Sequence, residues 1–293
     1  MTVQYKFSRF RISADLHPGY KLVQLRGVGG FGEVWEAEKA NGDKVALKFL
    51  PCTGARGGAN MELRSIQVVQ GLSHPQLIEI ERVWCAGTYL IIAMELADGS
   101  LNDLYDVYMD EKRPGMPPAH LLPLLDQAAK GIDFLNNQTH LIGDQRVTVQ
   151  HCDINPANIL VFGENVKLSD FSLTTMLTAP TKVHLRAGTT AYAAPEVFQG
   201  SLTHRTDQYA LAICYCRLRG ALPFKDTPST FLPTYCRPTP DLSMLTEAEK
   251  PIVARALSPV PEDRWPSCRE LVKELFKKTG TPRQASSPYL RRR

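Results

Sequence analysis

Two groups of residues in this sequence have the types and the spacing to act on phosphate groups. The first is the glycine-rich run 27–34, Gly-Val-Gly-Gly-Phe-Gly-Glu-Val, with Lys48 farther along at the end of an apolar stretch. The glycines of this G-x-G-x-x-G pattern have no Cβ, so the backbone can come close to phosphate oxygens, and Lys48 can reach them as a point charge. Lys48 then needs an acid to hold its ammonium group, and Glu62 is the candidate.

The second group combines the run 151–158, His-Cys-Asp-Ile-Asn-Pro-Ala-Asn, with the later segment Asp170-Phe171-Ser172. Asp153 and Asn158 stand on a loop between apolar segments, and Asp170 follows the strand-like residues 166–168. Oxygen ligands that approach from neighbouring strand ends suit Mg²⁺, which takes a few protein oxygens together with phosphate and water.

Each group also has a plainer interpretation. The glycine run could be a flexible hairpin turn, and the Asp and Asn residues could be ordinary turn residues. A dinucleotide-binding fingerprint needs a helix after the last glycine and an acid about 20 residues farther on. Here a strand-like segment follows Gly32, and Lys48 stands 16 residues after it. The sequence therefore disfavours dinucleotide binding.

The first hundred residues must position the glycine run, and they read mainly as β-sheet. Alternating apolar residues predict strands over 20–28, 33–39 and 44–50, with an Asn-Gly hairpin turn between the last two. Two more strands are expected around 77–84 and 89–96. Apolar residues at 63, 66, 69 and 72 predict one short helix over 61–72.

Beyond Gly99 the periodicity becomes helical. An apolar stripe from Leu121 to Leu135 predicts a helix after Pro117-Pro118, with Pro123 limiting its upstream extent. Thr246 with Glu249, and Ser267 with Glu270, have capping-box spacing and predict two more helices. The last residues, 279–293, are rich in Pro, Ser and Arg and are expected to be a disordered basic tail.

Composition and charge exclude several classes of protein. The chain has 293 residues, of which 43% are hydrophobic and 22% charged, as in ordinary globular domains. A net charge of +4 gives no dense basic face for nucleic acid. No apolar run approaches the roughly 20 residues of a membrane helix, and the N-terminus has no apolar signal core. Seven cysteines without a C-x-x-C pair favour reduced thiols and a cytoplasmic location.

Five motifs in order resemble those of a eukaryotic-like (Hanks-type) serine/threonine protein kinase domain. They are the glycine-rich loop, the VALK strand, HCDINPAN, DFS and Ala194-Pro195-Glu196, and the resemblance covers about residues 20–278. The compact domain is similar to bacterial members of that family. The resemblance implies an α+β, two-lobed protein kinase-like fold. An N-terminal antiparallel β-sheet lobe with one main helix (about 20–97) would precede a larger, mainly helical C-terminal lobe (about 98–278), and residues 1–19 would form an N-terminal extension.

The resemblance also implies a role for each matching residue, with ATP and Mg²⁺ (or Mn²⁺) as cofactors. Asp153 would orient the substrate hydroxyl and take its proton, Thr189 would hydrogen-bond Asp153, and Lys48, paired with Glu62, would hold the α- and β-phosphates. Asn158 and Asp170 would bind the metal. Asp207 would brace the catalytic loop, and Glu196 would pair with Arg264. The nucleotide would contact Gly27, Val28, Gly29, Gly30, Phe31, Gly32, Val34, Ala46, Met94 as gatekeeper, and the backbone from Glu95 to Ala97.

Two features of the resemblance favour a protein substrate phosphorylated on serine or threonine. Pro156 stands where serine/threonine kinases carry a proline, and 188–196 follows their G-T-x-x-Y-x-A-P-E pattern. Because small-molecule kinases of similar fold generally lack that stretch, such an activity is disfavoured. Four prolines between Pro223 and Thr246 predict that the usual substrate-docking helix is short or missing. The sequence does not indicate an oligomeric state.

Four residues depart from the family pattern. Asn155 replaces the catalytic-loop lysine. The loss of one positive charge that faces a transferring phosphoryl group costs about 10²–10³ in rate. Ser172 replaces the glycine of D-F-G. Cys152 replaces the arginine of H-R-D, so phosphorylation at Thr174, Thr175, Thr178 or Thr181 should matter less for activation. Glu62 stands 12 residues before His74, which is about one helical turn farther than in the family. The spacing usual in the family would place the acid at Ser65.

The sequence therefore supports two functions of different classes. The first is a protein kinase that transfers the γ-phosphoryl of ATP to serine or threonine, because the metal ligands, the base and the phosphate lysine are all retained. The alternative is a pseudokinase, a nucleotide-binding or scaffold module with weak or no phosphotransfer, for which Asn155 and Ser172 are the evidence.

Overall fold

The protein divides into two compact units in its computed structural model. The structure describes residues 12, 17–29, 32–52, 63, 66, 71–137, 140–142, 145–177, 181–182, 189–283 and 287–290. The N-terminal unit comprises residues 1–70 and 78–97, and the C-terminal unit comprises residues 71–77 and 98–293. None of the helices in the described part of the chain is long and apolar enough to cross a membrane.

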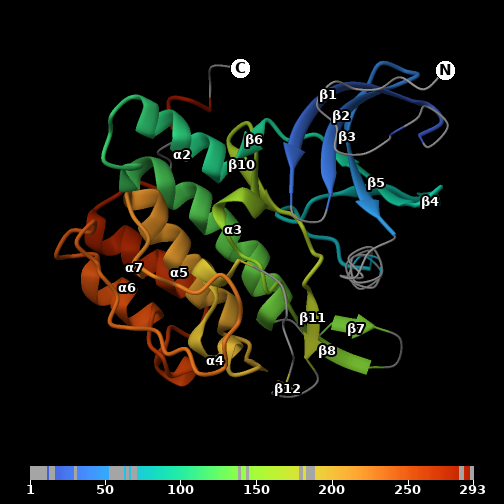
Figure 1. Cartoon of the computed structure of the whole chain (residues 1–293). Coiled ribbons are helices and arrows are strands. Elements are labelled where there is room, and N and C mark those ends of the chain that lie inside the picture. Colours follow the sequence, from blue (N-terminus) through green and yellow to red (C-terminus); the bar gives the residue numbers. More distant parts are fainter. Residues whose placement is uncertain are drawn as a thin grey trace. The chain divides into compact units, whose positions relative to one another are not determined.

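The N-terminal unit is built on one antiparallel sheet, in which five strands lie in the order β1-β2-β3-β5-β4 (Figure 1). This confirms the predicted N-terminal β-sheet lobe. The turn at Asn41-Gly42 joins two neighbouring strands, as the sequence predicts, and Gly42 has a φ of 87°. The strands are β1 (Tyr20–Val28), β2 (Glu33–Lys39), β3 (Lys44–Pro51), β4 (Ile80–Ala86) and β5 (Tyr89–Glu95).

Alternation along β3 gives the sheet two buried faces. Val45, Leu47 and Phe49 belong to one apolar cluster, together with Trp35 and Ile91. Residues on the opposite face belong to a second cluster, formed by Leu50, Leu90, Ile92 and the helical residue Ile66. Side chains alternate along a strand, so Lys48, which pairs with Ile92 in register, lies on this second face.

The C-terminal unit is mainly helical and also contains short strands and 3₁₀ turns. Its helices are α2 (Leu101–Asp110), α3 (Pro118–Asn137), α4 (Pro195–Phe198), α5 (Thr206–Arg219), α6 (Lys250–Ala256) and α7 (Cys268–Thr279). Its 3₁₀ turns are η2 (Pro156–Asn158), η3 (Thr190–Tyr192) and η4 (Pro261–Asp263). Its strands are β6 (Gly99–Ser100), β7 (His140–Ile142), β8 (Gln145–Gln150), β9 (Ile159–Phe162), β10 (Asn165–Leu168), β11 (Thr175–Leu177), β12 (Thr181–Lys182) and β13 (Ser201–Leu202).

Helix α3 corrects one expectation, because Pro123 lies inside it and does not limit its upstream end. A proline in a helix removes one backbone donor, but α3 also buries an apolar face along most of its length. Leu121, Leu124, Leu125 and Ile132 on that face are no more than 2% exposed. The burial of this face outweighs the lost hydrogen bond.

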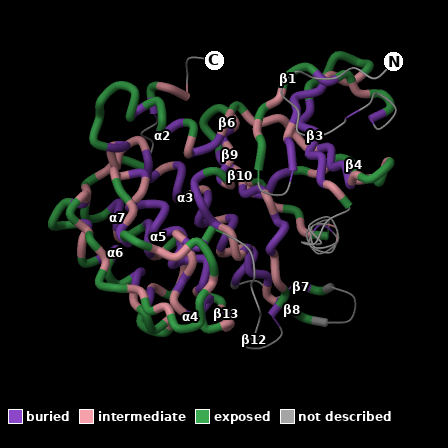
Figure 2. The backbone as a smooth tube through the Cα atoms, in the orientation of Figure 1, coloured by how far each residue is buried: buried purple, intermediate pink, exposed green. Residues whose placement is uncertain are grey.

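Helix α5 is buried on nearly all sides. Of its 14 residues, 12 are buried, and Figure 2 shows the tube in purple along much of its length. A helix that is buried all round belongs to the centre of a core rather than to its edge. Its first turn nevertheless contains the buried polar residues Thr206, Asp207 and Gln208, each of which needs a partner.

The stretch from Ala221 to Glu249 contains no helix, and every residue in it is described. This agrees with the proline pattern of the sequence. The stretch ends at Glu249, which is fully buried and accepts hydrogen bonds from Arg219 (2.9 Å) and from the backbone N–H of Thr246 (2.8 Å). Tyr215 also donates to the Glu249 carboxylate. Glu249 thus joins this stretch to α5 and to the start of α6.

Part of the C-terminal segment packs against α2, in contrast to the expected disordered tail. Ser287 is fully buried, and its hydroxyl lies 2.8 Å from the Tyr108 hydroxyl. The ring of Tyr289 meets Tyr108 edge-on, with centroids 4.8 Å apart. Composition predicts disorder where few apolar contacts are available, but the Ser287 hydroxyl and the Tyr289 ring both find a partner in Tyr108 of α2.

We predict that Glu249→Gln lowers the free energy of unfolding by about 2–4 kcal/mol at pH 7, because it leaves the Arg219 guanidinium buried without a counter-charge. Burial opposes ionisation of Glu249, but bonds from Arg219, Tyr215 and Thr246 outweigh it and lower the pKa from 4.5 to about 2. A carboxyl group whose pKa is lowered by folding stabilises the fold at pH values above its pKa in the unfolded chain. This stabilisation is lost as the pH falls toward its pKa in the folded protein. The difference from the parent should therefore shrink between pH 4.5 and pH 2.

Urea unfolding at pH 7 and at pH 3 checks this expectation. Glu247→Gln is the matched control, because Glu247 also faces a basic side chain but is 90% exposed, and it should change stability by less than about 0.5 kcal/mol. Equal effects of the two substitutions would contradict the assignment of stability to the buried pair.

Candidate active site

The glycine-rich turn between β1 and β2 uses its glycines for different purposes. A Cβ on Gly32 would lie 2.2 Å from the carbonyl oxygen of Phe49 on β3, so packing alone requires glycine there. A Cβ on Gly27 would meet nothing within 4 Å. The Gly29 N–H donates to the Gly32 carbonyl at 2.8 Å and closes the turn. The fold therefore explains Gly32, whereas Gly27 leaves open backbone that a ligand can approach.

Four of the predicted nucleotide contacts share one face of the N-terminal sheet. Val34 pairs with Lys48 across β2 and β3, and Ala46 pairs with Met94 across β3 and β5. Paired residues lie on the same face, as do residues two apart along a strand. Lys48 is 9% exposed, so the residue is held largely out of water.

At the end of β5, some of the backbone groups of Glu95 and Ala97 already have hydrogen-bond partners. The Glu95 N–H donates to the Glu79 carbonyl at 3.2 Å, and the Glu95 carboxylate accepts from the Glu79 N–H at 2.7 Å. The Ala97 carbonyl accepts from Arg26 at 3.4 Å. Glu62, Gly30 and Phe31 lie outside the described residues, so the predicted pairing of Lys48 with Glu62 stays a prediction.

In the C-terminal unit, the loop from His151 to Asn158 is held from below by Asp207 of α5. The two Asp207 oxygens accept the backbone N–H groups of His151 (2.8 Å) and Cys152 (2.9 Å). Asp207 is 1% exposed, and its burial raises its pKa, while the two N–H donors oppose that rise. The loop can then hold Cys152 at a φ of 66°, which is uncommon for a residue with a Cβ.

Asp153 is oriented by two donors, one for each carboxylate oxygen. The Asn158 side-chain amide donates to one oxygen at 3.0 Å, and the Thr189 backbone N–H donates to the other at 3.1 Å. The resemblance to protein kinases implies a hydrogen bond between Thr189 and Asp153. In the structure, the backbone N–H of Thr189 makes this bond. The Thr189 hydroxyl instead accepts from Asn155 at 3.5 Å.

Asn155, at the position of the missing lysine, has a structural use of its own. Its side-chain oxygen accepts the Ala157 N–H at 3.0 Å and caps η2, while its amide nitrogen donates to the Asp153 carbonyl at 3.1 Å. A neutral amide thus replaces a charge and ties Asp153 to the next turn. This arrangement orders the loop but supplies no positive charge.

Asn158 and Asp170 flank the hairpin of β9 and β10, in which Ile159 pairs with Leu168. The Asn158 carbonyl accepts the Ser169 N–H at 2.9 Å, so the residue before β9 lies beside the residues that follow β10. Because the Asn158 amide nitrogen is bound to Asp153, its amide oxygen is the atom that can face a cation. One carboxylate and one amide oxygen match the ligands of Mg²⁺, which completes its shell with phosphate and water.

His151 links the loop 151–158 to the residues that follow β10, although sequence analysis gave it no role. Its Nε2 lies 3.0 Å from the Ser169 carbonyl oxygen, and its ring contacts Phe171 with centroids 5.1 Å apart. Ser172 then donates to the Asp170 carboxylate at 2.7 Å. Asp170 has a φ of 58°, so this short hydroxyl bond helps to hold an uncommon backbone conformation.

The Cys152 thiol is unsuited to read a phosphate. Burial and then the charge of Asp207 raise its pKa well above the usual range, so it stays a neutral thiol. The threonines at which phosphorylation is predicted to matter less for activation differ in setting. The Thr174 hydroxyl is buried, Thr175 of β11 pairs with Gln150 of β8, and Thr178 lies outside the described residues.

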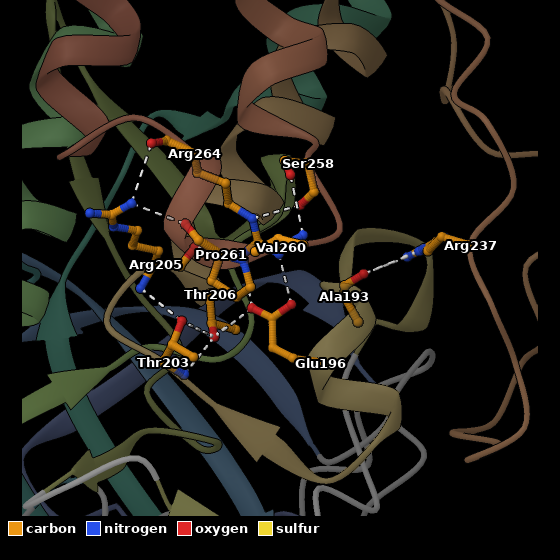
Figure 3. Close-up of polar contacts among 10 residues, drawn as sticks. All are labelled: Ala193, Glu196, Thr203, Arg205, Thr206, Arg237, Ser258, Val260, Pro261 and Arg264. Atoms are coloured by element: carbon orange, nitrogen blue, oxygen red, sulfur yellow. Dashed lines mark hydrogen bonds and ion pairs between the residues drawn. The ribbon is translucent and has the colours of Figure 1, made fainter.

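Glu196 and Arg264 form the predicted buried ion pair, with two parallel bonds of 2.8 Å each (Figure 3). Sequence analysis missed two further members of this group. Thr206 donates to Glu196 at 3.0 Å, and the Arg205 backbone carbonyl accepts from Arg264 at 3.0 Å. Full hydrogen bonding of both charged groups is what makes their burial tolerable. In the described residues, no cluster of three or more His, Cys, Asp or Glu side chains could hold a further metal.

Comparison with known proteins gives one family. The model of the protein kinase domain matches residues 20–291. Serine/threonine-protein kinase PknF of Mycobacterium tuberculosis is 27% identical over 281 residues, which cover 89% of this chain and 56% of that protein. CBL-interacting serine/threonine-protein kinase 16 of Arabidopsis thaliana is 29% identical over 301 residues, which cover 94% of this chain and 61% of that protein. The chain thus spans less than two thirds of each relative.

We predict that Asp207→Ala lowers the free energy of unfolding by about 2–4 kcal/mol, because it leaves the N–H groups of His151 and Cys152 buried without an acceptor. Urea unfolding measures the effect. Asp106→Ala, at an exposed position on α2, is the control and should stay within about 0.5 kcal/mol of the parent. Equal stability of the two variants would show that Asp207 does not support the loop.

Proposed function

The chain belongs to the protein kinase family, and we propose that it transfers the γ-phosphoryl group of ATP to serine or threonine hydroxyls of a protein substrate. The observation that carries this proposal is the Asp153 carboxylate, oriented by Asn158 and by the Thr189 N–H. Its position is fixed by donors on both oxygens, as a group that aligns a nucleophile requires.

The N-terminal unit would bind the phosphates of ATP through backbone groups and through the positive charge of one lysine. The open backbone at Gly27 and Gly29 can approach the phosphates, and Lys48 would contact the α- and β-phosphates. Val34, Ala46 and Met94 lie on the same face as Lys48 and would contact the adenine. These contacts position the nucleotide and contribute little covalent chemistry, as expected for phosphoryl transfer.

The C-terminal unit would hold Mg²⁺ and the substrate hydroxyl. Asn158 and Asp170 supply oxygens of the kind that Mg²⁺ binds, and the ion, when bound, neutralises charge on the phosphate oxygens. Asp153 would accept a hydrogen bond from the substrate hydroxyl and take its proton as the phosphoryl group is transferred.

The absence of a lysine at position 155 sets the expected rate. Asn155 is committed to Ala157, to the Asp153 carbonyl and to Thr189, so it brings order but no cation to the transferred group. We therefore expect slower turnover than in a kinase that has the lysine, by about 10²–10³. Serine and threonine specificity is supported by the names of the relatives and by the 188–196 pattern. A cytoplasmic location fits seven free thiols.

The test is intact-mass spectrometry of the protein after incubation with ATP and Mg²⁺, and then with Mn²⁺. We expect phosphoryl additions on the parent and on Asp106→Ala, and none on Asp153→Ala. Peptide mapping should place them on serine or threonine. If the parent gains none and also fails to phosphorylate a serine/threonine peptide library, the alternative of a scaffold holds instead, and thermal stabilisation by ATP then shows whether it binds nucleotide.

We further predict that Asn155→Lys raises turnover about tenfold or more, because it returns a positive charge to the transferred phosphoryl group. The KM for ATP should change little, since the other nucleotide contacts remain. Initial rates over a range of ATP concentrations measure both quantities. Asn155→Gln, which keeps an amide without adding charge, is the control and should not gain turnover. An unchanged rate in the lysine variant would show that the missing charge does not limit phosphotransfer.

A further inference from the structure

Arg237 lies in the helix-free stretch 221–249 and directs its guanidinium at the backbone of residues 190–193. One terminal nitrogen donates to the carbonyls of Thr190 (2.7 Å), Ala191 (3.1 Å) and Ala193 (2.7 Å). The Nε donates to the same Ala193 carbonyl at 3.3 Å, a contact visible in Figure 3. The other terminal nitrogen donates to Thr227 at 2.8 Å.

Aromatic rings surround the same guanidinium. Its central carbon lies 4.6 Å from the ring centre of Phe224, 5.3 Å from that of Phe198 and 5.8 Å from that of Tyr235. Cation–π attraction strengthens when water is excluded, and a planar guanidinium suits stacked rings and forked hydrogen bonding at once. Lysine has neither the fork nor the plane, so it cannot reproduce this arrangement.

A second contact joins the same two stretches. The Thr190 hydroxyl donates to the Pro228 carbonyl at 2.7 Å. Residues 190–193 are therefore bound by two residues, Arg237 and Pro228, that belong to the helix-free stretch. The short 3₁₀ turn η3 has no side-chain cap of its own. The bonds from Arg237 and Thr190 add long-range support to the local bond that the Ala193 N–H donates to the Thr190 carbonyl at 3.2 Å.

The bound segment adjoins Asp153. The Thr189 N–H, directly before the segment, donates to the Asp153 carboxylate. Tyr192 and Ala193 line a small hollow together with Asp153 and Thr189. A shift of residues 190–193 would therefore move both the donor on Asp153 and the wall beside it. Lys48 and Gly27 belong to the other unit, the N-terminal one.

We propose that Arg237 is a positioning residue for the protein substrate, which holds residues 190–193 so that a peptide can dock beside Asp153. The proposal rests on the phosphotransferase function proposed above. In this chain the helix-free stretch 221–249 supplies the support through one arginine and its aromatic surround. The nucleotide contacts should be insensitive to it.

The experiment compares Arg237→Lys, which keeps the charge but loses the fork, with Arg237→Met, which keeps only the stem. Lys225→Met is the control, because Lys225 lies in the same stretch and is 80% exposed. Initial rates are measured with a degenerate serine/threonine peptide pool and with ATP, each varied in turn. We expect the KM for peptide to rise about tenfold in both Arg237 variants, with the KM for ATP within about twofold of the parent. The control should match the parent in both.

Amide hydrogen exchange provides a readout that does not depend on activity. In Arg237→Lys, exchange should accelerate selectively at residues 189–194, while α3 and α5 keep their protection. Faster exchange there, with a parent that transfers no phosphate, would show that Arg237 holds residues 190–193 but would overturn the proposed function and, with it, the role in substrate docking. Unchanged exchange at 189–194, or an equal rise in both KM values, would overturn the role of Arg237. Uniformly faster exchange would show loss of the fold and overturn it likewise.

Discussion

The first turn of α5 places three consecutive polar residues inside the core, and each must find a partner there. Thr206 donates to Glu196, Asp207 accepts two N–H groups of the loop 151–158, and Gln208 exchanges two bonds with the backbone of Trp265. A buried polar group without a partner costs about 1–3 kcal/mol, so these bonds are demanded by the burial of the helix itself. One turn of helix thereby fixes three segments that are distant in sequence.

The same constraint explains how the site keeps uncommon backbone conformations. Cys152 and Asp170 both have positive φ values, and each lies next to residues held by long-range bonds. Asp207 holds the loop at Cys152, and His151 extends that hold to Ser169, directly before Asp170. Strained residues persist where the surroundings over-determine them, and here the surroundings reach through His151 to α5. Asp153 and Asp170 are thus positioned from one buried carboxylate.

Two neutral residues of this site, Asn155 and Cys152, stand where the family pattern has a lysine and an arginine, and Ser172 stands where it has a glycine. Asn155 and Ser172 form hydrogen bonds to the Asp153 carbonyl and to the Asp170 carboxylate, and Cys152 is a protonated thiol. Asn155 and Ser172 preserve order in the loop, whereas Asn155 and Cys152 leave the site without two positive charges that could face phosphate. Arg237 follows the opposite course, because a charged group of the helix-free stretch supports residues 190–193. A chain built this way would retain the alignment needed for phosphotransfer while depending less on phosphate-reading cations.

The sequence by itself determined the strands of the N-terminal unit, the motifs and the helix cap at Ser267, because alternation, turn chemistry and capping act over a few residues. Only the tertiary structure decided which groups meet. It gave Asp153 the Thr189 backbone N–H, allowed Pro123 inside α3, and packed Ser287 against Tyr108, 179 residues away. Arg237 likewise bonds to Thr190 and Ala193, which precede it by 47 and 44 positions, and no local pattern in the sequence indicates these bonds. Such partners are chosen by burial, which obliges a polar group to bond whatever the fold brings within reach, and no short stretch of sequence encodes that choice.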